Sequence, residues 1–291
     1  MWYDKIEFKH TTCMDKYNEC KPIKENVILL YVVMTRKCNV NCKFCEFTKG
    51  SVIVDIEQFE KLYKELRQVC YISTVHFTGG EPTLELDKIK RICSIVKNSD
   101  EFTQTSVNTN GIFLERLNNI AELDNISLSR HHYEDNKNIE IFGNNSVPNI
   151  GRLMNFTEKK KLHLSCNLIK GYIDSEIEIQ KYLDFAGQLD IHDIGIVSLM
   201  GINDYCTDNF VSFENIDLSK IPNLCNSRCY RKYKENTDLL LCRCDNYLYT
   251  TKDMKLVSMY HRYAIKNDEI ADCLVYENNH IKQGFSGQIL V

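Results

Sequence analysis

The sequence predicts an α/β protein: a partial (β/α)6 parallel barrel followed by a small Cys-rich β-hairpin C-terminal domain. Two observations predict the barrel. Apolar strand segments alternate with amphipathic helical segments up to about residue 200, and polar motifs follow the ends of several strands. Beyond that point the alternation stops, and cysteines and hairpin-like segments follow. We therefore expect an N-terminal extension at 1–26, the barrel at 27–205 and an auxiliary domain at 206–291.

The expected elements follow one another in a regular order. The first strand is the apolar run Val27 to Met34, which is typical of a strand buried on both faces. Asp55 is the expected N-cap of a helix whose apolar residues, from Phe59 to Leu66, recur at helical spacing. Further strands are expected at 74–77, 105–108, 126–129, 162–169 and 194–199, and further helices at 86–97, 114–123 and 176–189. Parallel strands joined by helices need right-handed crossovers.

Composition and charge exclude several classes of protein. The net charge of −4 and the absence of a Lys/Arg-rich tract do not indicate nucleic acid as a partner. The chain has no apolar run long enough to cross a bilayer and no signal-peptide core, so we expect a cytoplasmic protein without a membrane partner. In such a protein, 14 clustered cysteines favour metal ligation over disulfides.

A cysteine triad follows the first strand: Cys38, Cys42 and Cys45, with Phe44 before the last. Three thiolates can hold three irons of a cubane cluster and leave the fourth iron open to a ligand that is not protein. A structural zinc site is the alternative, but it normally needs four ligands, and no fourth Cys or His follows nearby. The triad therefore predicts a cluster that binds and activates a substrate or cofactor.

The spacing of the triad resembles the cluster motif of the radical S-adenosylmethionine (radical SAM) enzymes. The resemblance implies that S-adenosylmethionine chelates the open iron of a 4Fe–4S cluster and that Phe44 contacts this cofactor. It also implies that the reduced cluster cleaves S-adenosylmethionine to a 5′-deoxyadenosyl radical, which abstracts a hydrogen atom from a substrate. A flavodoxin- or ferredoxin-type reductant would be the partner that supplies the electron.

The segment Thr78 to Pro82, at the end of the second strand, resembles the GGEP signature of the same family. Gly79 and Gly80 let backbone groups come close to a ligand, and Glu81 can offer its carboxylate to an ammonium group. The resemblance implies that this segment holds the methionyl amine of S-adenosylmethionine. An ordinary Gly-Gly turn is the alternative.

Three further strand ends carry polar side chains that the resemblance assigns to S-adenosylmethionine. Ser106 and Asn108 share one face of the third strand, and both can hydrogen-bond a ribose hydroxyl. Ser129 and Arg130 end the fourth strand, where Arg130 can pair with the carboxylate. Asn167, on the fifth strand, would face the adenosine.

Three residues are candidates for contact with the substrate during catalysis. His132 and Tyr133 follow the fourth strand and could reach a substrate, with a solvated strand-to-loop junction as the alternative. Cys206 follows the sixth strand, and a thiol at this position could donate a hydrogen atom to a substrate radical.

A second group of cysteines lies beyond the expected barrel: Cys225, Cys229, Cys242 and Cys244. Their paired spacing, followed by two expected strands around a turn at 247–257, resembles the Twitch or SPASM extensions of radical SAM enzymes. The resemblance implies that these four sulfurs hold a second, auxiliary 4Fe–4S cluster.

The ligand set of the auxiliary cluster stays open, because the sequence departs from the family pattern. Met254 stands in the turn where relatives usually have Gly, and no Cys stands just past that turn. Cys206 and Cys273 are alternative ligands. A zinc ion held by four thiolates is the alternative metal centre.

Taken together, the motifs predict an enzyme, a radical SAM oxidoreductase or maturase. The resemblance to Twitch and SPASM relatives makes a ribosomally made peptide the first expected substrate and a small polar metabolite, of sugar or nucleoside type, the second. A GTP cyclase is disfavoured, because those proteins end in Gly-Gly whereas this chain ends Ile289-Leu290-Val291. An iron–sulfur electron carrier and a zinc-binding protein are the alternatives outside this family.

Overall fold

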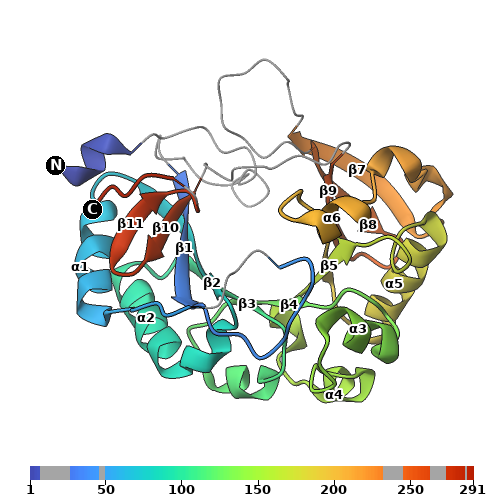
Figure 1. Ribbon diagram of the computed structural model, residues 1–291, viewed down its shortest axis with the longest axis horizontal. Helices are drawn as coiled ribbons and strands as arrows, with labels where there is room; N and C mark the ends of the chain where they lie inside the picture. Colours follow the sequence, from blue (N-terminus) through green and yellow to red (C-terminus); the bar gives the residue numbers. More distant parts are fainter. Residues whose placement is uncertain (7–26, 46–49, 232–244, 263–272, 286) are drawn as a thin grey trace.

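The computed structural model describes residues 1–6, 27–45, 50–231, 245–262, 273–285 and 287–291. Within these ranges the strands form one 11-stranded sheet with the order β11-β10-β1-β2-β3-β4-β5-β6-β9-β8-β7. The sheet curves into an open arc, and the helices lie on the outside of that arc (Figure 1). None of the helices in the described ranges has the length and apolar character needed to cross a membrane.

The central part of the sheet is parallel. Its strands are β1 (Val27–Thr35), β2 (Tyr71–Gly79), β3 (Gln104–Thr109), β4 (Asn125–Ser129), β5 (Leu162–Leu168) and β6 (Asp193–Ser198). Each of these strands pairs in parallel with the next in the chain. The helices are α1 (Ile56–Leu66), α2 (Leu86–Ser99), α3 (Asp135–Phe142), α4 (Ile150–Asn155), α5 (Glu176–Gln188) and α6 (Asp204–Asp208). The α/β class and the mostly parallel sheet are confirmed.

Burial along β5 shows how the sequence places its two faces. Buried apolar residues alternate with half-buried polar residues along the whole strand. Leu164 belongs to the main core together with Ile194 of β6 and Tyr182 of α5. Ser165 and Asn167 lie on the opposite face, because side chains alternate along a strand. Since the helices cover the outside of the arc, these polar residues belong to its inner face (Figure 1).

Local sequence explains α1 and one element that differs from expectation. Asp55 caps α1 as expected, since its Oδ1 accepts a hydrogen bond from the Gln58 backbone N at 2.9 Å. The helix expected at 114–123 is instead a 3₁₀ helix, Leu114–Asn119. Its apolar residues recur every three positions, which matches the three residues per turn of a 3₁₀ helix.

Residues after α6 extend this sheet at the β6 end. The strands β7 (Leu224–Arg231), β8 (Asp245–Thr251) and β9 (Leu256–His261) form an antiparallel meander. β9 then pairs in parallel with β6, so the meander continues the barrel sheet and does not form a sheet of its own. The turn between β8 and β9 has Met254 in the left-handed region, with φ of 63°.

The last two strands extend the sheet at the β1 end, and the sequence reasoning did not predict them. β10 (Leu274–Glu277) pairs in parallel with β1, and β11 (His280–Gln283) forms a hairpin with β10. Figure 1 shows β10 and β11 at one end of the arc and the meander at the other. The division into a barrel and an auxiliary domain at residue 206 stays a prediction.

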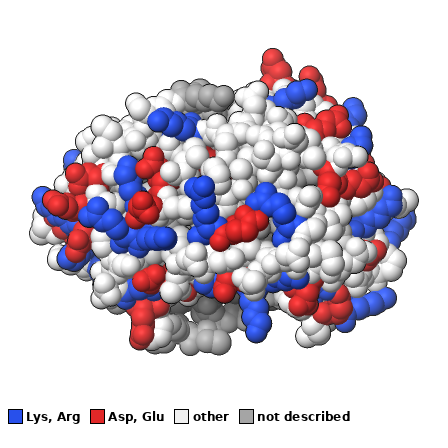
Figure 2. All heavy atoms as spheres, turned by 90° about the horizontal axis from the view of Figure 1, so that it is seen from below, with Lys and Arg blue, Asp and Glu red and all other residues white. Residues whose placement is uncertain are grey.

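One face of the molecule shows how the charged side chains are distributed. Figure 2 shows Lys and Arg side chains interspersed with Asp and Glu on the face seen there, without a large area of one sign. Such a mixed face gives no electrostatic attraction for a polyanion.

Candidate functional site

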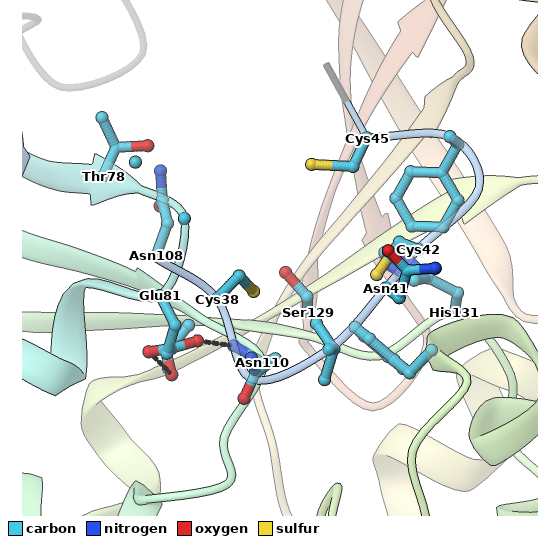
Figure 3. A pocket seen from close by; sticks show the side chains of 16 residues that line it. Cys38, Asn41, Cys42, Cys45, Thr78, Glu81, Asn108, Asn110, Ser129 and His131 are labelled. Atoms are coloured by element: carbon cyan, nitrogen blue, oxygen red, sulfur yellow. Dashed lines mark hydrogen bonds between the residues drawn. The ribbon is translucent and has the colours of Figure 1, made fainter. Parts of the chain in front are cut away.

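A cavity of about 510 Å³ lies at the carboxyl ends of β2, β3 and β4, beside the loop that follows β1. Of the residues predicted from the sequence, those that line it are Cys38, Cys42, Phe44, Cys45, Gly79, Gly80, Glu81, Asn108 and Ser129. Figure 3 shows the three cysteines around one space, with Ser129 beside it and Asn108 across from Cys45. Parallel strands bring their carboxyl ends together, and this explains why distant motifs meet here.

The three thiols of the triad line the same cavity. Within the described ranges, no three His, Cys, Asp or Glu side chains are placed to hold one metal ion. A cubane spreads its thiolate ligands over separate irons. Burial, followed by the charges of Cys45 and Cys38, raises the pKa of the Cys42 thiol to about 12. Iron would supply the positive charge that keeps three neighbouring sulfurs as thiolates.

The glycine pair after β2 packs against the start of the cysteine loop. The Gly80 backbone N donates to Thr35 O at 2.7 Å, and the Glu81 N donates to Lys37 O at 2.8 Å. A Cβ at Gly80 would lie 2.2 Å from Lys37 O, and Gly79 has φ of 122°. Glycine is therefore required here for two backbone segments of the protein to meet.

The Glu81 carboxylate is engaged inside the protein. It is 1% exposed, and it accepts hydrogen bonds from Thr83 N and Oγ1, from Thr109 Oγ1 at 2.7 Å and from Asn110 N at 2.9 Å. Burial raises the pKa of this carboxyl group, while these donors act in the opposite direction. Its oxygens join the ends of β2 and β3, and the contact that we expected between this carboxylate and the methionyl ammonium stays a prediction.

Asn39, inside the cysteine loop, is held from two sides. Its Oδ1 accepts a hydrogen bond from Asn110 Nδ2 at 2.7 Å, and its carbonyl accepts one from Asn144 Nδ2 at 2.6 Å. Because the Asn110 backbone N binds Glu81, a chain of hydrogen bonds runs from Glu81 to the cysteine loop. This chain fixes the backbone on which the cysteines lie.

Cys206 does not line the cavity. It is fully buried, and its Sγ donates to Phe44 O at 3.7 Å. Asn203, the N-cap of α6, donates from Nδ2 to Lys43 O at 3.1 Å. Cys206 therefore helps α6 to hold the end of the cysteine loop, and the expectation that its thiol gives a hydrogen atom to a substrate stays a prediction.

Arg130, His132 and Tyr133 also lie outside the cavity lining. Arg130 is 1% exposed and forms an ion pair with Asp135 at 2.7 Å. Tyr133 Oη donates to Glu178 Oε2 at 2.9 Å, and the His132 ring packs on the Tyr133 ring with centroids 4.4 Å apart. The chain after β4 turns toward α3 and α5, where these side chains have their partners, and their roles toward S-adenosylmethionine or a substrate stay predictions.

Two other predicted contacts lie near the cavity without lining it. Ser106 is 4% exposed and pairs in register with His76 of β2. The Asn167 backbone N donates to His131 Nδ1 at 3.1 Å. The roles of Ser106 and Asn167 as S-adenosylmethionine contacts stay predictions.

His131 is a lining residue that the sequence reasoning missed. It is 3% exposed, and its ring packs edge-on against Phe44 and stacks on Phe142, with centroids 4.9 Å and 5.1 Å apart. Burial lowers the pKa of His131 to about 3, so the imidazole is neutral at physiological pH. The signal was present, because His131 continues the two-residue period of β4 after Ser129, whereas His132 falls on the other face.

The second cysteine group is only partly described. Cys225 is the second residue of β7, and its Sγ donates a hydrogen bond to Thr250 O at 3.2 Å. Cys229 belongs to the same strand, while Cys242 and Cys244 lie outside the described residues. The auxiliary cluster and its zinc alternative therefore stay predictions.

Cys273, an alternative ligand for that cluster, occupies a different part of the fold. It is 1% exposed and packs with Val33 of β1 and Val275 of β10. β10 and β7 lie near opposite ends of the strand order. This position does not favour Cys273 as a partner of Cys225.

Comparison with known proteins identifies the family. Residues 32–185 match the family model of the Radical SAM superfamily. The chain belongs to the radical SAM superfamily and is an enzyme of that superfamily. Membership implies a 4Fe–4S cluster and S-adenosylmethionine.

The individual proteins that resemble this chain share only a small part of its sequence. A GTP 3′,8-cyclase of Lactiplantibacillus plantarum is 25% identical over 216 residues, which cover 64% of this chain and 63% of the relative. A GTP 3′,8-cyclase of Limosilactobacillus fermentum is 29% identical over 177 residues, covering 57% and 51%. The crystal structure of Streptococcus suis SuiB bound to S-adenosylmethionine has a TM-score of 0.51 at 18% identity, covering 62% and 42%. The chain spans less than two thirds of the length of each of these relatives, and the SuiB likeness concerns the fold alone.

Proposed function

We propose that this radical SAM enzyme holds its 4Fe–4S cluster on Cys38, Cys42 and Cys45 and binds S-adenosylmethionine in the adjoining cavity. The observation that carries this proposal is that the three thiols and the polar ends of β2, β3 and β4 line one cavity. When bound, the cluster and S-adenosylmethionine supply a 5′-deoxyadenosyl radical that removes a hydrogen atom from a substrate.

Side chains on opposite walls of the cavity would bind different parts of S-adenosylmethionine. Thr78 and Asn108 line the wall near the glycine pair, and their oxygens can accept a hydrogen bond from the methionyl ammonium in place of Glu81. Ser129 lies between the walls and can bond a ribose or carboxylate oxygen. Phe44, half-buried on the other wall, offers a flat apolar surface to the adenine.

A ribosomally made peptide is the first substrate class that we propose. It is supported by the fold likeness to SuiB, for which a structure bound to the precursor peptide SuiA has a TM-score of 0.50 at 17% identity. A nucleotide or another small polar metabolite is the second class. It is supported by the GTP 3′,8-cyclases among the sequence relatives.

An auxiliary cluster on Cys225, Cys229, Cys242 and Cys244 is the remaining part of the proposal. Its support is the number and paired spacing of these thiols, since four thiolates satisfy one 4Fe–4S cluster completely. This auxiliary cluster would accept the electron from a substrate radical or anchor the substrate.

The first experiment measures iron and sulfide on anaerobically reconstituted protein and then 5′-deoxyadenosine after addition of dithionite and S-adenosylmethionine. We expect 5′-deoxyadenosine, with about four irons for the triad alone or about eight with the auxiliary cluster. Stoichiometric zinc without iron would contradict the proposal. If iron is present but no 5′-deoxyadenosine forms, an unchanged electron paramagnetic resonance signal after addition of S-adenosylmethionine would also contradict it.

The substrate classes are separated in the same preparation. Candidate peptides encoded by genes next to this one, and GTP, are added in turn, and the rate of 5′-deoxyadenosine formation is compared with the rate without them. Faster cleavage with a peptide and a mass change in that peptide support the first class. A response to GTP alone overturns it in favour of the second.

A further inference from the structure

The hairpin of β10 and β11 contacts the chain on both sides of the cysteine loop. The loop begins at Arg36, directly after β1, and the chain that returns from it reaches the N-cap of α1 at Asp55. Because β10 pairs in parallel with β1, the turn that follows β10 lies at the same end of the sheet as these two residues (Figure 1). One short turn therefore meets both ends of the segment that carries the triad.

Glu277 holds the beginning of the loop through Arg36. Its Oε1 accepts hydrogen bonds from Arg36 Nε at 2.9 Å and from Arg36 Nη2, and its Oε2 accepts one from Lys282 Nζ at 2.9 Å. The Glu277 side chain is 8% exposed. An ion pair with two hydrogen bonds and little access to water is stronger than a pair on the open surface. Arg36 lies two residues before Cys38, so this pair fixes the backbone next to the first thiol.

Asn278 and Asn279 hold the end of the segment. Asn278 Oδ1 accepts a hydrogen bond from Ile53 N at 3.1 Å, and Asn279 Oδ1 accepts one from Asp55 N at 2.8 Å. Tyr276 Oη donates to Asp55 O at 3.0 Å. The residue that caps α1 is thereby bound to the hairpin through both of its backbone polar groups.

Apolar contacts join the same parts of the chain. A Cβ at Gly50 would lie 3.5 Å from Arg36 Cδ, so the returning chain runs beside the Arg36 side chain. Val52 packs with Val33 of β1 and Val275 of β10. The two ends of the segment are therefore held together by packing as well as by hydrogen bonds.

The residues of the turn suit these contacts better than they suit the turn alone. Asn278 and Asn279 have φ of 51° and 66°, a left-handed conformation that Gly adopts at lower cost. Gly at both positions would make the same turn, but it would offer no side-chain acceptor to Ile53 N and Asp55 N. The Asn pair therefore adds two hydrogen bonds that a hairpin by itself does not need.

We propose that the β10–β11 hairpin is a clamp on the cysteine loop, with Glu277, Asn278 and Asn279 as positioning residues that keep the three thiols in the arrangement that binds the cluster. This inference rests on the proposed function, which assigns the cluster to the triad. Because energetic coupling between two sites is reciprocal, the cluster in turn holds the hairpin in place. Loss of the clamp opens the loop more often, and loss of the cluster opens the hairpin more often.

The test removes the contacts to the loop and keeps the hairpin. The double variant Asn278→Gly/Asn279→Gly retains the turn and loses two acceptors. Glu277→Met loses its acceptor, and Glu277→Gln keeps one. Lys282→Met is the matched control for Glu277, because Lys282 contacts this carboxylate from within the hairpin. Met254→Gly is the matched control for the turn, since Met254 also has a positive φ but lies between β8 and β9.

The first measurement is the rate at which the iron-loaded proteins lose iron to an excess of chelator under anaerobic conditions. This rate should rise by about tenfold in Asn278→Gly/Asn279→Gly and in Glu277→Met, with a smaller rise in Glu277→Gln. Both controls should release iron at the wild-type rate. Circular dichroism decides which variants are folded, and either the Gly pair or Glu277→Met is sufficient. A folded clamp variant that cannot be loaded with iron would show the same loss more strongly.

The second measurement separates positioning from general stabilisation. Hydrogen–deuterium exchange is followed by mass spectrometry on the wild type and on Asn278→Gly/Asn279→Gly, each with and without iron. Iron loading of the wild type should slow exchange in peptides covering 273–285 by about tenfold more than in peptides covering α5, because the cluster holds the hairpin through the loop. This difference between the two regions should become smaller in the double variant.

Either of two results would overturn the inference and leave the proposed function intact. One is an iron-release rate that is the same in the clamp variants as in their controls. The other is equal protection of 273–285 and of α5 when the wild type is loaded with iron. A wild-type protein that binds no iron is a different result, because it contradicts the proposed function itself.

Discussion

The two cysteine groups of this chain lie in different kinds of backbone. The triad lies in a loop at the end of β1, where Cys45 N donates to Cys42 O in a tight turn. Cys225 and Cys229 instead lie within β7, paired in register with Thr250 and Tyr247 of β8. An extended strand separates residues four apart by about 13 Å, whereas a turn brings them together. The same spacing along the chain therefore places two cysteines at different distances in a turn and in a strand.

The largest expected effect follows from removing one cysteine of the triad in the loop after β1. Cys42→Ala should abolish formation of 5′-deoxyadenosine, because the cluster loses one of its three thiolates. Cys93→Ala is the matched control, since Cys93 is a fully buried cysteine of the α2 core. Anaerobic assay of both variants with dithionite and S-adenosylmethionine measures the effect. Wild-type cleavage by Cys42→Ala would remove the triad from the site.

The next prediction tests the strand side. The double variant Cys242→Ala/Cys244→Ala should lose about four irons per chain and keep S-adenosylmethionine cleavage, because the auxiliary cluster loses two thiolates and the triad stays intact. Iron analysis and the 5′-deoxyadenosine assay are run on the same sample. An iron content equal to that of the wild type would show that these thiols hold no cluster.

A smaller effect concerns the carboxylate that anchors the cysteine loop. Glu81→Gln should destabilise the protein by about 1–3 kcal/mol, because the new amide group faces donors that lose their acceptor. Glu60→Gln is the control, because Glu60 is partly exposed on α1 and forms a surface ion pair with Lys64. Urea denaturation of the iron-free proteins gives both values. Equal stability of the two variants would contradict the anchoring role of Glu81.

The smallest expected effect is a change in the free energy of unfolding at the turn between β8 and β9. Met254→Gly should stabilise the protein by about 0.5–1 kcal/mol, because the left-handed conformation costs more for Met than the added chain entropy costs for Gly. Met154→Gly should have the opposite sign, since this exposed Met lies in the helix α4 and Gly weakens helices. Urea denaturation measures both, and a loss of stability in Met254→Gly would sink the prediction.

The sequence was sufficient for the barrel and for most of its cavity. Strand and helix periods placed β1 to β6, and the polar residues at their ends met because parallel strands end at one edge. Phe44, Asn108 and Ser129 line the cavity for this reason. Glu81 also lines the cavity, but the bonds of its carboxylate to Thr109 and Asn110 could not be read from the local sequence pattern.

The other differences between expectation and structure concern partners that the sequence reasoning did not place. Arg130 lies one residue beyond β4, where the chain leaves the strand, and its partner Asp135 belongs to a helix that the sequence reasoning did not predict. The hairpin of β10 and β11 was missed although Asn278-Asn279, with φ of 51° and 66°, is a two-residue turn signal. Its pairing with β1 depends on contacts across the whole chain, which local patterns do not report.

That pairing has a consequence for the order of events on the ribosome. Arg36, just before the cysteine loop, forms an ion pair with Glu277, and 241 residues of chain separate the two. At about 5–20 residues per second, synthesis of that stretch takes about 10–50 s. During this time β1 has an open edge, because β10 has not yet been made. A cluster inserted in that interval would enter a nascent site that still lacks one of its flanking supports.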